Sequence, residues 1–274
     1  MTIPPTTFVP CTAPPPGTRE RWAWDYVTTT NLESKLAIPT FPDAWEEGAP
    51  ARRIDAPGRP TELRVVPKSK KTPSLEALRH PERRAQLLHT FLHHELQAAE
   101  LMCWALLAFP DTPSPWKRGL LGICKDEIRH MAMYRKELAK VGIAYGDLPV
   151  NDWFWMRIPT ASSPAAFAAA MGIGFEGGNL DHAERFAARF EDVGDTEGAA
   201  IQRVVGDEEI AHVAFAVHWF REFTGGLDFD TWCAHLPAPL SPMVMRGSPQ
   251  NRRARERAGL DAAFLERLAA WTPA

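Results

Sequence analysis

Four long stretches with helical periodicity fill the chain between residues 81 and 226, and they set the fold class. Proline and glycine mark where each stretch stops. The first is expected over residues 81–109 and ends in FPDTPSP, where the prolines forbid continuation. The others are expected over residues 114–142, 163–194 and 195–226, and the last closes on a Gly-Gly pair. The sequence therefore predicts an all-α domain built on four helices.

The connections between these helices differ in length. Short connections join the first helix to the second and the third to the fourth, which is typical of antiparallel neighbours. About twenty residues, IAYGDLPVNDWFWMRIPTAS, separate the second helix from the third. A connection of that length can cross the bundle. We therefore expect two helix pairs joined by one long crossover.

Two extensions flank the predicted bundle. Residues 1–80 are rich in proline and poor in helical period, yet they carry aromatic residues such as Trp22 and Trp24, which disordered segments lack. This segment is expected to wrap across the bundle as an ordered extension. Residues 227–274 begin with a proline-rich stretch and are expected to end in an arginine-studded helix over residues 251–271.

Composition and charge exclude several classes of protein. With 45% hydrophobic and 24% charged residues and no apolar run of membrane-spanning length, the chain is expected to be soluble. A net charge of -3 gives no electrostatic footprint for nucleic acid as the main partner. The N-terminus lacks the basic start and apolar core of a signal peptide, and the four cysteines form no CxxC motif. We expect a cytoplasmic protein.

Two Glu-x-x-His pairs interrupt the apolar stripes of the helices. The second helix contains DEIRH, which gives Glu127 and His130, and the fourth contains EEIAH, which gives Glu209 and His212. Residues three apart point the same way from a helix, so both members of each pair face the core. One such pair is a weak signal, because most lie on helix surfaces. Two pairs on apolar stripes are a much stronger one.

The other two helices each add a glutamate to an apolar stripe. Glu95 lies in the first helix, 32 residues before Glu127, and Glu176 lies in the third, 33 residues before Glu209. The chain thus reads as two copies of one helix pair, each supplying Glu and then Glu-x-x-His. All four glutamates are expected to face one core at matching height.

Negative charge of this density indicates bound metal. Burying four unneutralised carboxylates would cost on the order of several kcal/mol each, whereas two divalent ions would cancel their charge. Carboxylate oxygens with one imidazole for each ion suit iron or manganese better than zinc. The expected metal ligands are Glu95, Glu127, His130, Glu176, Glu209 and His212. A buried acid–histidine network without metal is the alternative.

The motifs HHELQAAEL, DEIRH, FEGGNLDHAE and DEEIAH resemble the ferritin-like di-iron carboxylate superfamily. They are most similar to a bacterial branch whose function is unassigned, and the likeness covers roughly residues 80–225. The resemblance implies a ferritin-like four-helix bundle holding two irons, or an iron and a manganese, on the same six ligands. It also implies that Glu127 and Glu209 bridge the two ions, with Glu95 and Glu176 as terminal ligands.

Three further groups lie close to the predicted ligands. Glu100 is expected in a salt bridge or beside the ligands rather than among them. Asp181 shares a helical face with Glu184 and Arg185 and is expected to be solvated. His182 lies off the main stripe and is expected to pack in the core or beside the centre. Whether any of the three joins the ligands stays open.

Two acids directly precede ligand glutamates. Asp126 precedes Glu127 and Glu208 precedes Glu209, and adjacent helical residues face apart. Each is therefore a weak candidate to orient a ligand histidine, and acids from a neighbouring helix are expected to serve better.

Four glycines surround Glu176 in the third helix, at positions 172, 174, 177 and 178. Each costs about 1 kcal/mol in a helix interior relative to alanine. One explanation is that this segment holds a π-bulge or leaves open volume beside the metals; the other is close packing of helices on glycine.

Oxygen chemistry is the natural use of such a centre, and three functions fit the sequence. The first is an oxidoreductase that activates dioxygen to oxidise or hydroxylate a small organic substrate, with electrons from a separate donor. The second is a ferroxidase, iron-storage or peroxide-scavenging protein, and the third is a bundle in which metal is purely structural. The two long extensions favour the first, because a storage subunit needs little beyond its bundle. A monomer or homodimer is expected.

Overall fold

All regular structure in the computed structural model is helical, as the sequence predicts. The structure describes residues 12–68, 73–74 and 76–273; the first eleven residues of the expected N-terminal extension lie outside this part. Within the described residues there is no strand, and two isolated β-bridges occur. In chain order the elements are α1 (Arg19–Thr28), α2 (Leu32–Leu36), η1 (Glu76–Arg79), α3 (Pro81–Ala108), α4 (Ser114–Lys140), η2 (Ile158–Thr160), α5 (Pro164–Phe167), η3 (Ala168–Glu176), α6 (Gly177–Asp192), α7 (Thr196–Thr224), α8 (Phe229–Ala234), η4 (Pro242–Met245), α9 (Arg252–Arg257) and α10 (Ala262–Ala270).

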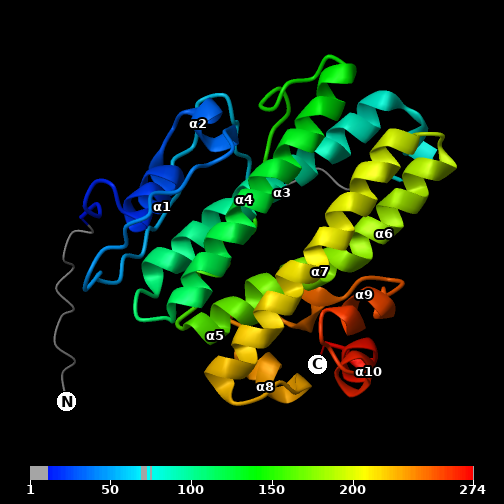
Figure 1. Cartoon of the computed structure of the whole chain (residues 1–274). Coiled ribbons are helices and arrows are strands. Elements are labelled where there is room, and N and C mark those ends of the chain that lie inside the picture. The colour runs from blue at the N-terminus through cyan, green and yellow to red at the C-terminus, as the bar shows by residue number, and fades with distance from the viewer. Residues whose placement is uncertain (1–11, 69–72, 75, 274) are drawn as a thin grey trace.

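Long helices pair two by two along the body of the molecule (Figure 1). α3 packs along α4, and α6 packs along α7. α7 also contacts both α4 and η3, so the two pairs share an interior. Residues 141–163, which include η2, carry the chain from the end of α4 to the start of α5.

The ends of the long helices follow the punctuation in the sequence. α3 stops at Ala108, immediately before FPDTPSP. The Ser163 hydroxyl accepts a hydrogen bond from the amide of Ala166 at the start of α5. The Asp195 carboxylate caps α7 in the same way through the amide of Gly198. Gly225 closes α7 with a φ of 80°, a left-handed conformation that glycine adopts without strain.

Both extensions differ in detail from the sequence expectation. The single C-terminal helix expected over residues 251–271 is wrong, because the chain breaks there into α9 and α10. The break falls at Gly259, which takes a φ of 91°, and Asp261 then caps α10 through the amide of Phe264. At the other end, helices α1 and α2 form where no helix was expected, and α1 packs against α3.

A buried ion cluster fastens the N-terminal segment to α3. The Lys35 ammonium of α2 donates to Glu100 Oε1 over 2.6 Å, and both side chains are fully buried. Arg59 clamps the same carboxylate with two hydrogen bonds of 2.6 and 2.8 Å. Glu100 therefore forms salt bridges, which is one of the two roles predicted for it from the sequence.

The same cluster reaches the long connection between α4 and α5. Arg59 Nε lies 3.0 Å from Asp152 Oδ2, and His93 Nε2 lies 2.9 Å from Asp152 Oδ1. The other nitrogen of His93 lies 2.7 Å from the Tyr145 hydroxyl. Three segments far apart in sequence are therefore held together by charge and hydrogen bonds around α3.

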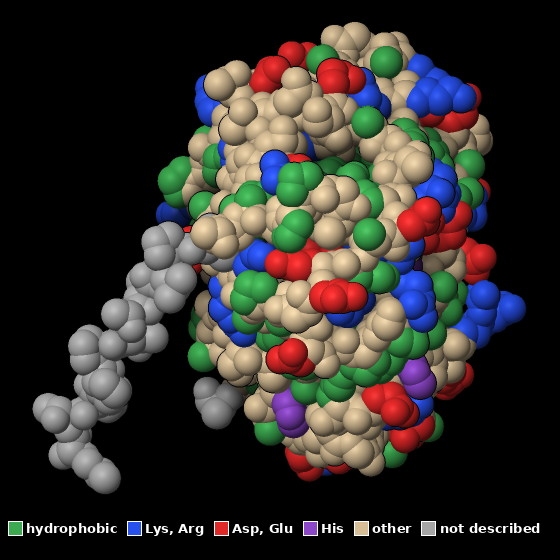
Figure 2. All heavy atoms as spheres, turned by 60° about the vertical axis from the view of Figure 1, so that its left-hand side comes forward, with side chains coloured by type: hydrophobic (Ala, Val, Ile, Leu, Met, Phe, Trp, Pro, Cys, Tyr) green, Lys and Arg blue, Asp and Glu red, His purple; other side chains and the backbone are tan. Residues whose placement is uncertain are grey.

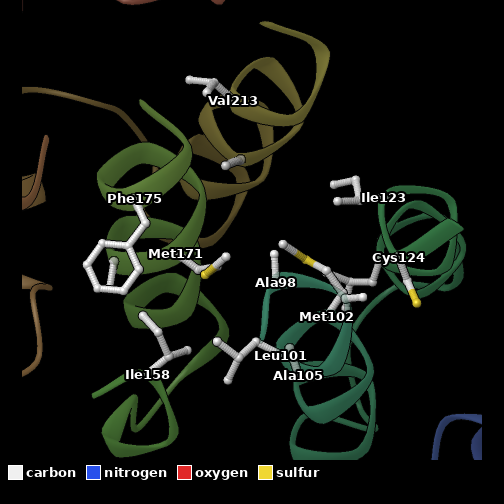
Figure 3. Close-up of a cluster of buried hydrophobic side chains, with 14 of the residues drawn as sticks. Ala98, Leu101, Met102, Ala105, Ile123, Cys124, Ile158, Met171, Phe175 and Val213 are labelled. Atoms are coloured by element: carbon white, nitrogen blue, oxygen red, sulfur yellow. The ribbon is translucent and has the colours of Figure 1, made fainter. Parts of the chain in front are cut away.

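Apolar packing fills the space between the helix pairs. In Figure 3, Met171 of η3 and Leu101 of α3 extend from opposite sides into the space between the helix pairs, and Ile158 of η2 enters it from the same side as Met171. Cys103 and Cys124, from α3 and α4, are buried as free thiols. On the outer face in Figure 2, acidic and basic side chains are interspersed, in keeping with the small net charge. None of the described helices combines the length and apolarity that crossing a bilayer requires.

Replacing Glu100 with alanine is expected to lower the free energy of unfolding by about 3–5 kcal/mol, because Lys35 would keep a buried charge without a carboxylate partner and Arg59 would keep only Asp152. Urea denaturation measures the change. Asp230→Ala is the matched control, since Asp230 pairs with Arg267 at the exposed surface, and it is expected to leave the unfolding midpoint unchanged. Equal midpoints for the two variants would contradict this account of the cluster.

Candidate metal centre

Six ionisable side chains meet inside the paired helices. α3 supplies one of them, α4 two, the end of η3 one and α7 two: Glu95, Glu127, His130, Glu176, Glu209 and His212. None of the six is more than 5% exposed. Four of them, Glu95, Glu127, His130 and Glu209, can place ligand atoms within 4.8 Å of one another, so the cluster could hold a metal ion.

His130 turns its Nδ1 atom toward the carboxylates. This nitrogen lies 3.3 Å from Glu127 Oε2, one helical turn away on α4. It also lies 3.9 Å from Glu95 Oε2 on α3 and 3.9 Å from Glu209 Oε1 on α7. One imidazole nitrogen is thus surrounded by oxygens from three helices.

His212 repeats this arrangement from the other helix pair. Its Nδ1 lies 2.9 Å from Glu209 Oε2 on the same helix and 3.1 Å from Glu127 Oε1 on α4. Glu127 and Glu209 therefore each direct one oxygen toward His130 and the other toward His212. These two carboxylates occupy the middle of the cluster, between the imidazoles.

The outer nitrogens of both histidines meet acids from the opposite helix. His130 Nε2 lies 2.7 Å from Glu208 Oε2 on α7, and His212 Nε2 lies 3.5 Å from Asp126 Oδ2 on α4. Arg129 pairs with both acids and holds them in place. The prediction that acids of a neighbouring helix orient the imidazoles is confirmed. The low weight given to Asp126 and Glu208 was wrong, because each serves the histidine of the other helix rather than its own.

Glu176 enters the centre from a π-helix. The third predicted helix winds as α5, then as nine residues of π-helix in η3, then as α6, so the predicted π-distortion is confirmed. Glu176 ends η3, and its buried Oε1 has no hydrogen-bond partner within the described residues. An unsatisfied carboxylate oxygen at this depth is a ligand position that invites a cation.

Close packing of these glycines on neighbouring segments, the second explanation, is confirmed as well, and no open volume lies beside their Cα atoms. A Cβ atom on Gly172 would lie 2.2 Å from the Cβ of Ala216 on α7. A Cβ atom on Gly178 would lie 2.8 Å from the carbonyl oxygen of Val244. Glycine therefore lets η3 and α6 approach α7 and η4 more closely than any other residue would.

The electrostatics of the cluster favour added positive charge. Burial, and after it the charge of Glu127, raises the pKa of Glu95 well above its usual range. Burial and the charge of Glu209 do the same to the pKa of Glu176. Burial opposes the charged form of His130, but hydrogen bonds and charge from Glu127 and Glu95 outweigh it and raise the His130 pKa to about 12.

The pKa of Glu127 shifts in the opposite direction, downward. Burial alone would raise its pKa, but the two imidazoles, His130 and His212, outweigh burial and lower it below the usual range. Protons on the imidazoles thus serve as counter-charges for the central carboxylate. Metal ions could take the same role, since hard oxygen donors and one imidazole on each side match the donor set of iron or manganese.

Two of the three neighbouring groups are engaged elsewhere. Asp181 is buried and forms an ion pair with Arg255, so the expectation that it is solvated was wrong. Its carboxylate also accepts from the amides of Gly247 and Asn251, which ties the C-terminal extension to α6. Glu100 pairs with Lys35 and Arg59, as described above.

A cavity of about 250 Å³ adjoins the centre and ends against Glu95 and Glu176. His182, half-buried beside Phe186, lines this cavity, in agreement with the expected place beside the centre. Asn179 also lines it and donates to Glu209 Oε1 over 3.3 Å. Sequence reasoning missed Asn179, although its position three residues after Glu176 repeats the spacing of the Glu-x-x-His pairs.

Comparison with known proteins identifies a family for this chain but no activity. A family model described as "Protein of unknown function (DUF455)" matches residues 19–266, which include all six residues of the centre. No curated protein and no solved structure matches the chain.

Replacing Gly172 with alanine is expected to lower the free energy of unfolding by about 1–3 kcal/mol, because the new methyl group would overlap Ala216. Gly122 is the control: it lies in α4 and a Cβ there would meet nothing within 4 Å. Gly122→Ala is expected to stabilise by about 0.4–1 kcal/mol. Urea titrations of both variants measure these changes in the free energy of unfolding, which are expected to have opposite signs. Stabilisation by Gly172→Ala would refute the close approach of η3 to α7.

Proposed function

Because the chain belongs to the DUF455 family, whose description names no activity, we propose a function from the site itself. The protein holds two metal ions, a pair of irons or an iron and a manganese, in a ferritin-like bundle. It uses them to activate dioxygen for the oxidation or hydroxylation of a small organic substrate. A separate donor supplies electrons, and the protein works as a monomer or homodimer.

One observation carries the proposal: the two central carboxylates divide their oxygens between the two imidazoles. Glu127 directs Oε2 to His130 and Oε1 to His212, and Glu209 does the reverse. An acid–histidine network needs no such division, whereas two bridged ions require it. Glu127 and Glu209 would be the bridges, and Glu95 and Glu176 would complete the two ends.

Charge supports two ions rather than one. Four ionised carboxylates carry four negative charges, which two divalent cations cancel while both imidazoles stay neutral. Glu208 and Asp126 then fix which imidazole nitrogen faces the metal, because each occupies the outer nitrogen. Nδ1 is left free as the ligand atom on both histidines.

The helix arrangement supports a ferritin-like bundle. α3 with α4 and α6 with α7 form two pairs, and residues 141–163 link the pairs in a single long connection. Each pair contributes a glutamate and then a Glu-x-x-His motif, which is the ligand pattern of di-iron bundles.

When bound, two reduced irons would supply electrons to dioxygen; the protein's own residues do the rest. The helices keep the centre dry, since its residues are at most 5% exposed. The adjoining cavity gives a substrate direct access to the side of the centre formed by Glu95 and Glu176. This cavity favours the oxidoreductase over the ferroxidase or storage protein and over a purely structural metal, because neither of those needs an organic-sized space beside the ligands.

Metal analysis of protein purified without added metal tests the proposal. We expect about two ions per chain, as iron or as iron with manganese. Glu127→Ala and Glu209→Ala are each expected to lose most of this metal, because each removes the carboxylate between the two histidines. Glu222→Ala, an exposed change on α7, is the control and should keep full content. Full metal content in both ligand variants would end the assignment.

Asp126→Asn and Glu208→Gln are each expected to weaken metal affinity by about 10–100-fold, because the imidazoles would lose the acids that orient them. Competition with a chelator of known affinity measures the loss. Asp207→Asn provides the control, since Asp207 adjoins Glu208 in sequence but pairs with Arg257 at the surface. Wild-type affinity in both variants would show that these acids do not serve the centre.

A further inference from the structure

The cavity beside the centre has a definite size and wall. Its volume of about 250 Å³ exceeds the roughly 150 Å³ that holds benzene in an apolar protein interior. Aromatic rings from α3, α4, the long connection and η3 make up much of the wall, among them Phe91, Tyr134, Trp153 and Phe175. One or two fused rings fill a space of this kind.

The aromatic wall is held rigid by its own contacts. Phe154 stacks on Phe175 with ring centroids 4.6 Å apart, and Trp153 lies 5.0 Å from Phe175. His94 stacks on the Phe154 ring at 4.8 Å. These rings come from three separate segments, so the flat surface they offer is formed before any ligand arrives.

The cavity wall offers no positively charged side chain to a ligand within the described residues. Burial lowers the pKa of His182 to about 4, so this imidazole is neutral near pH 7. Asn179 is neutral as well. Among the described residues that line the cavity there is no lysine or arginine, and its acids are Glu95 and Glu176.

We propose that this cavity binds an uncharged, flat aromatic molecule of one or two fused rings, the substrate class of the centre; this rests on the proposed function. An anionic ligand would be buried in a wall that offers no lysine or arginine as a counter-charge, at a high desolvation cost. His94, His182 and Asn179 can each exchange one hydrogen bond with a hydroxyl or amino substituent. Stacking on Phe154 and Phe175 supplies the rest of the affinity.

Two probes that share a ring system test the charge selectivity. 2-Naphthol is uncharged and 2-naphthoate is anionic at pH 7, and calorimetric titration measures both against metal-free and metal-loaded protein. We expect 2-naphthol to bind one per chain in both forms, and 2-naphthoate to bind the metal-free protein at least tenfold more weakly. Equal or tighter binding of 2-naphthoate to the metal-free protein overturns the proposal, as does failure of 2-naphthol to bind.

Filling the cavity locates the binding site. Val244→Phe places a ring in the cavity wall and is expected to weaken 2-naphthol binding at least tenfold. Met243→Trp is a second such change at a residue that is 54% exposed and therefore tolerant of substitution. Val65→Phe, at an exposed position away from the cavity, is the control and should bind as the wild type does. Wild-type binding in both folded cavity variants overturns the assignment of the cavity.

The metal-free titration separates this proposal from the proposed function. Binding of 2-naphthol to a protein that never takes up metal would keep the cavity assignment and refute the metal centre. Two bound ions together with no binding of 2-naphthol would refute the cavity assignment and leave the metal centre standing.

Discussion

Mutual repulsion of carboxylates in a dry interior governs the centre of this molecule. Glu95, Glu127, Glu176 and Glu209 come from four helical segments and converge where water cannot screen them. Such an arrangement requires positive charge between the carboxylates or protons on some of them; the two imidazoles provide sites for positive charge, and the raised pKa values of Glu95 and Glu176 favour protonation. Most other buried side chains of these helices are apolar, although α3 also buries His93, Gln97 and Glu100.

A second buried cluster stabilises what surrounds the centre. Glu100 lies five residues beyond Glu95 on α3, and it gathers Lys35 and Arg59 from the N-terminal segment. Through Arg59 the cluster reaches Asp152, which immediately precedes the aromatic residues that wall the cavity. The N-terminal segment thus bears on the shape of the cavity.

Sequence periodicity predicted the four long helices and the burial of all six central residues, because a 3.6-residue repeat and proline or glycine punctuation are local signals. The carboxylates appeared as exceptions within apolar stripes, which is also a local signal. The reciprocal pairing of Asp126 with His212 and of Glu208 with His130 could not be predicted, since it depends on how two helices lie against each other. The break at Gly259 was missed because an isolated glycine within a helical pattern has no fixed consequence.

The reciprocal pairing makes the centre sensitive to helix spacing. On α4 the chain sends Glu127 inward and Asp126 across to α7; on α7 it sends Glu209 inward and Glu208 across to α4. Sliding or separating these two helices would therefore tilt both imidazoles at once, in a correlated way. The orientation of both imidazole rings therefore depends on the distance between α4 and α7, and a movement of one helix against the other would shift the Nδ1 atoms of both histidines.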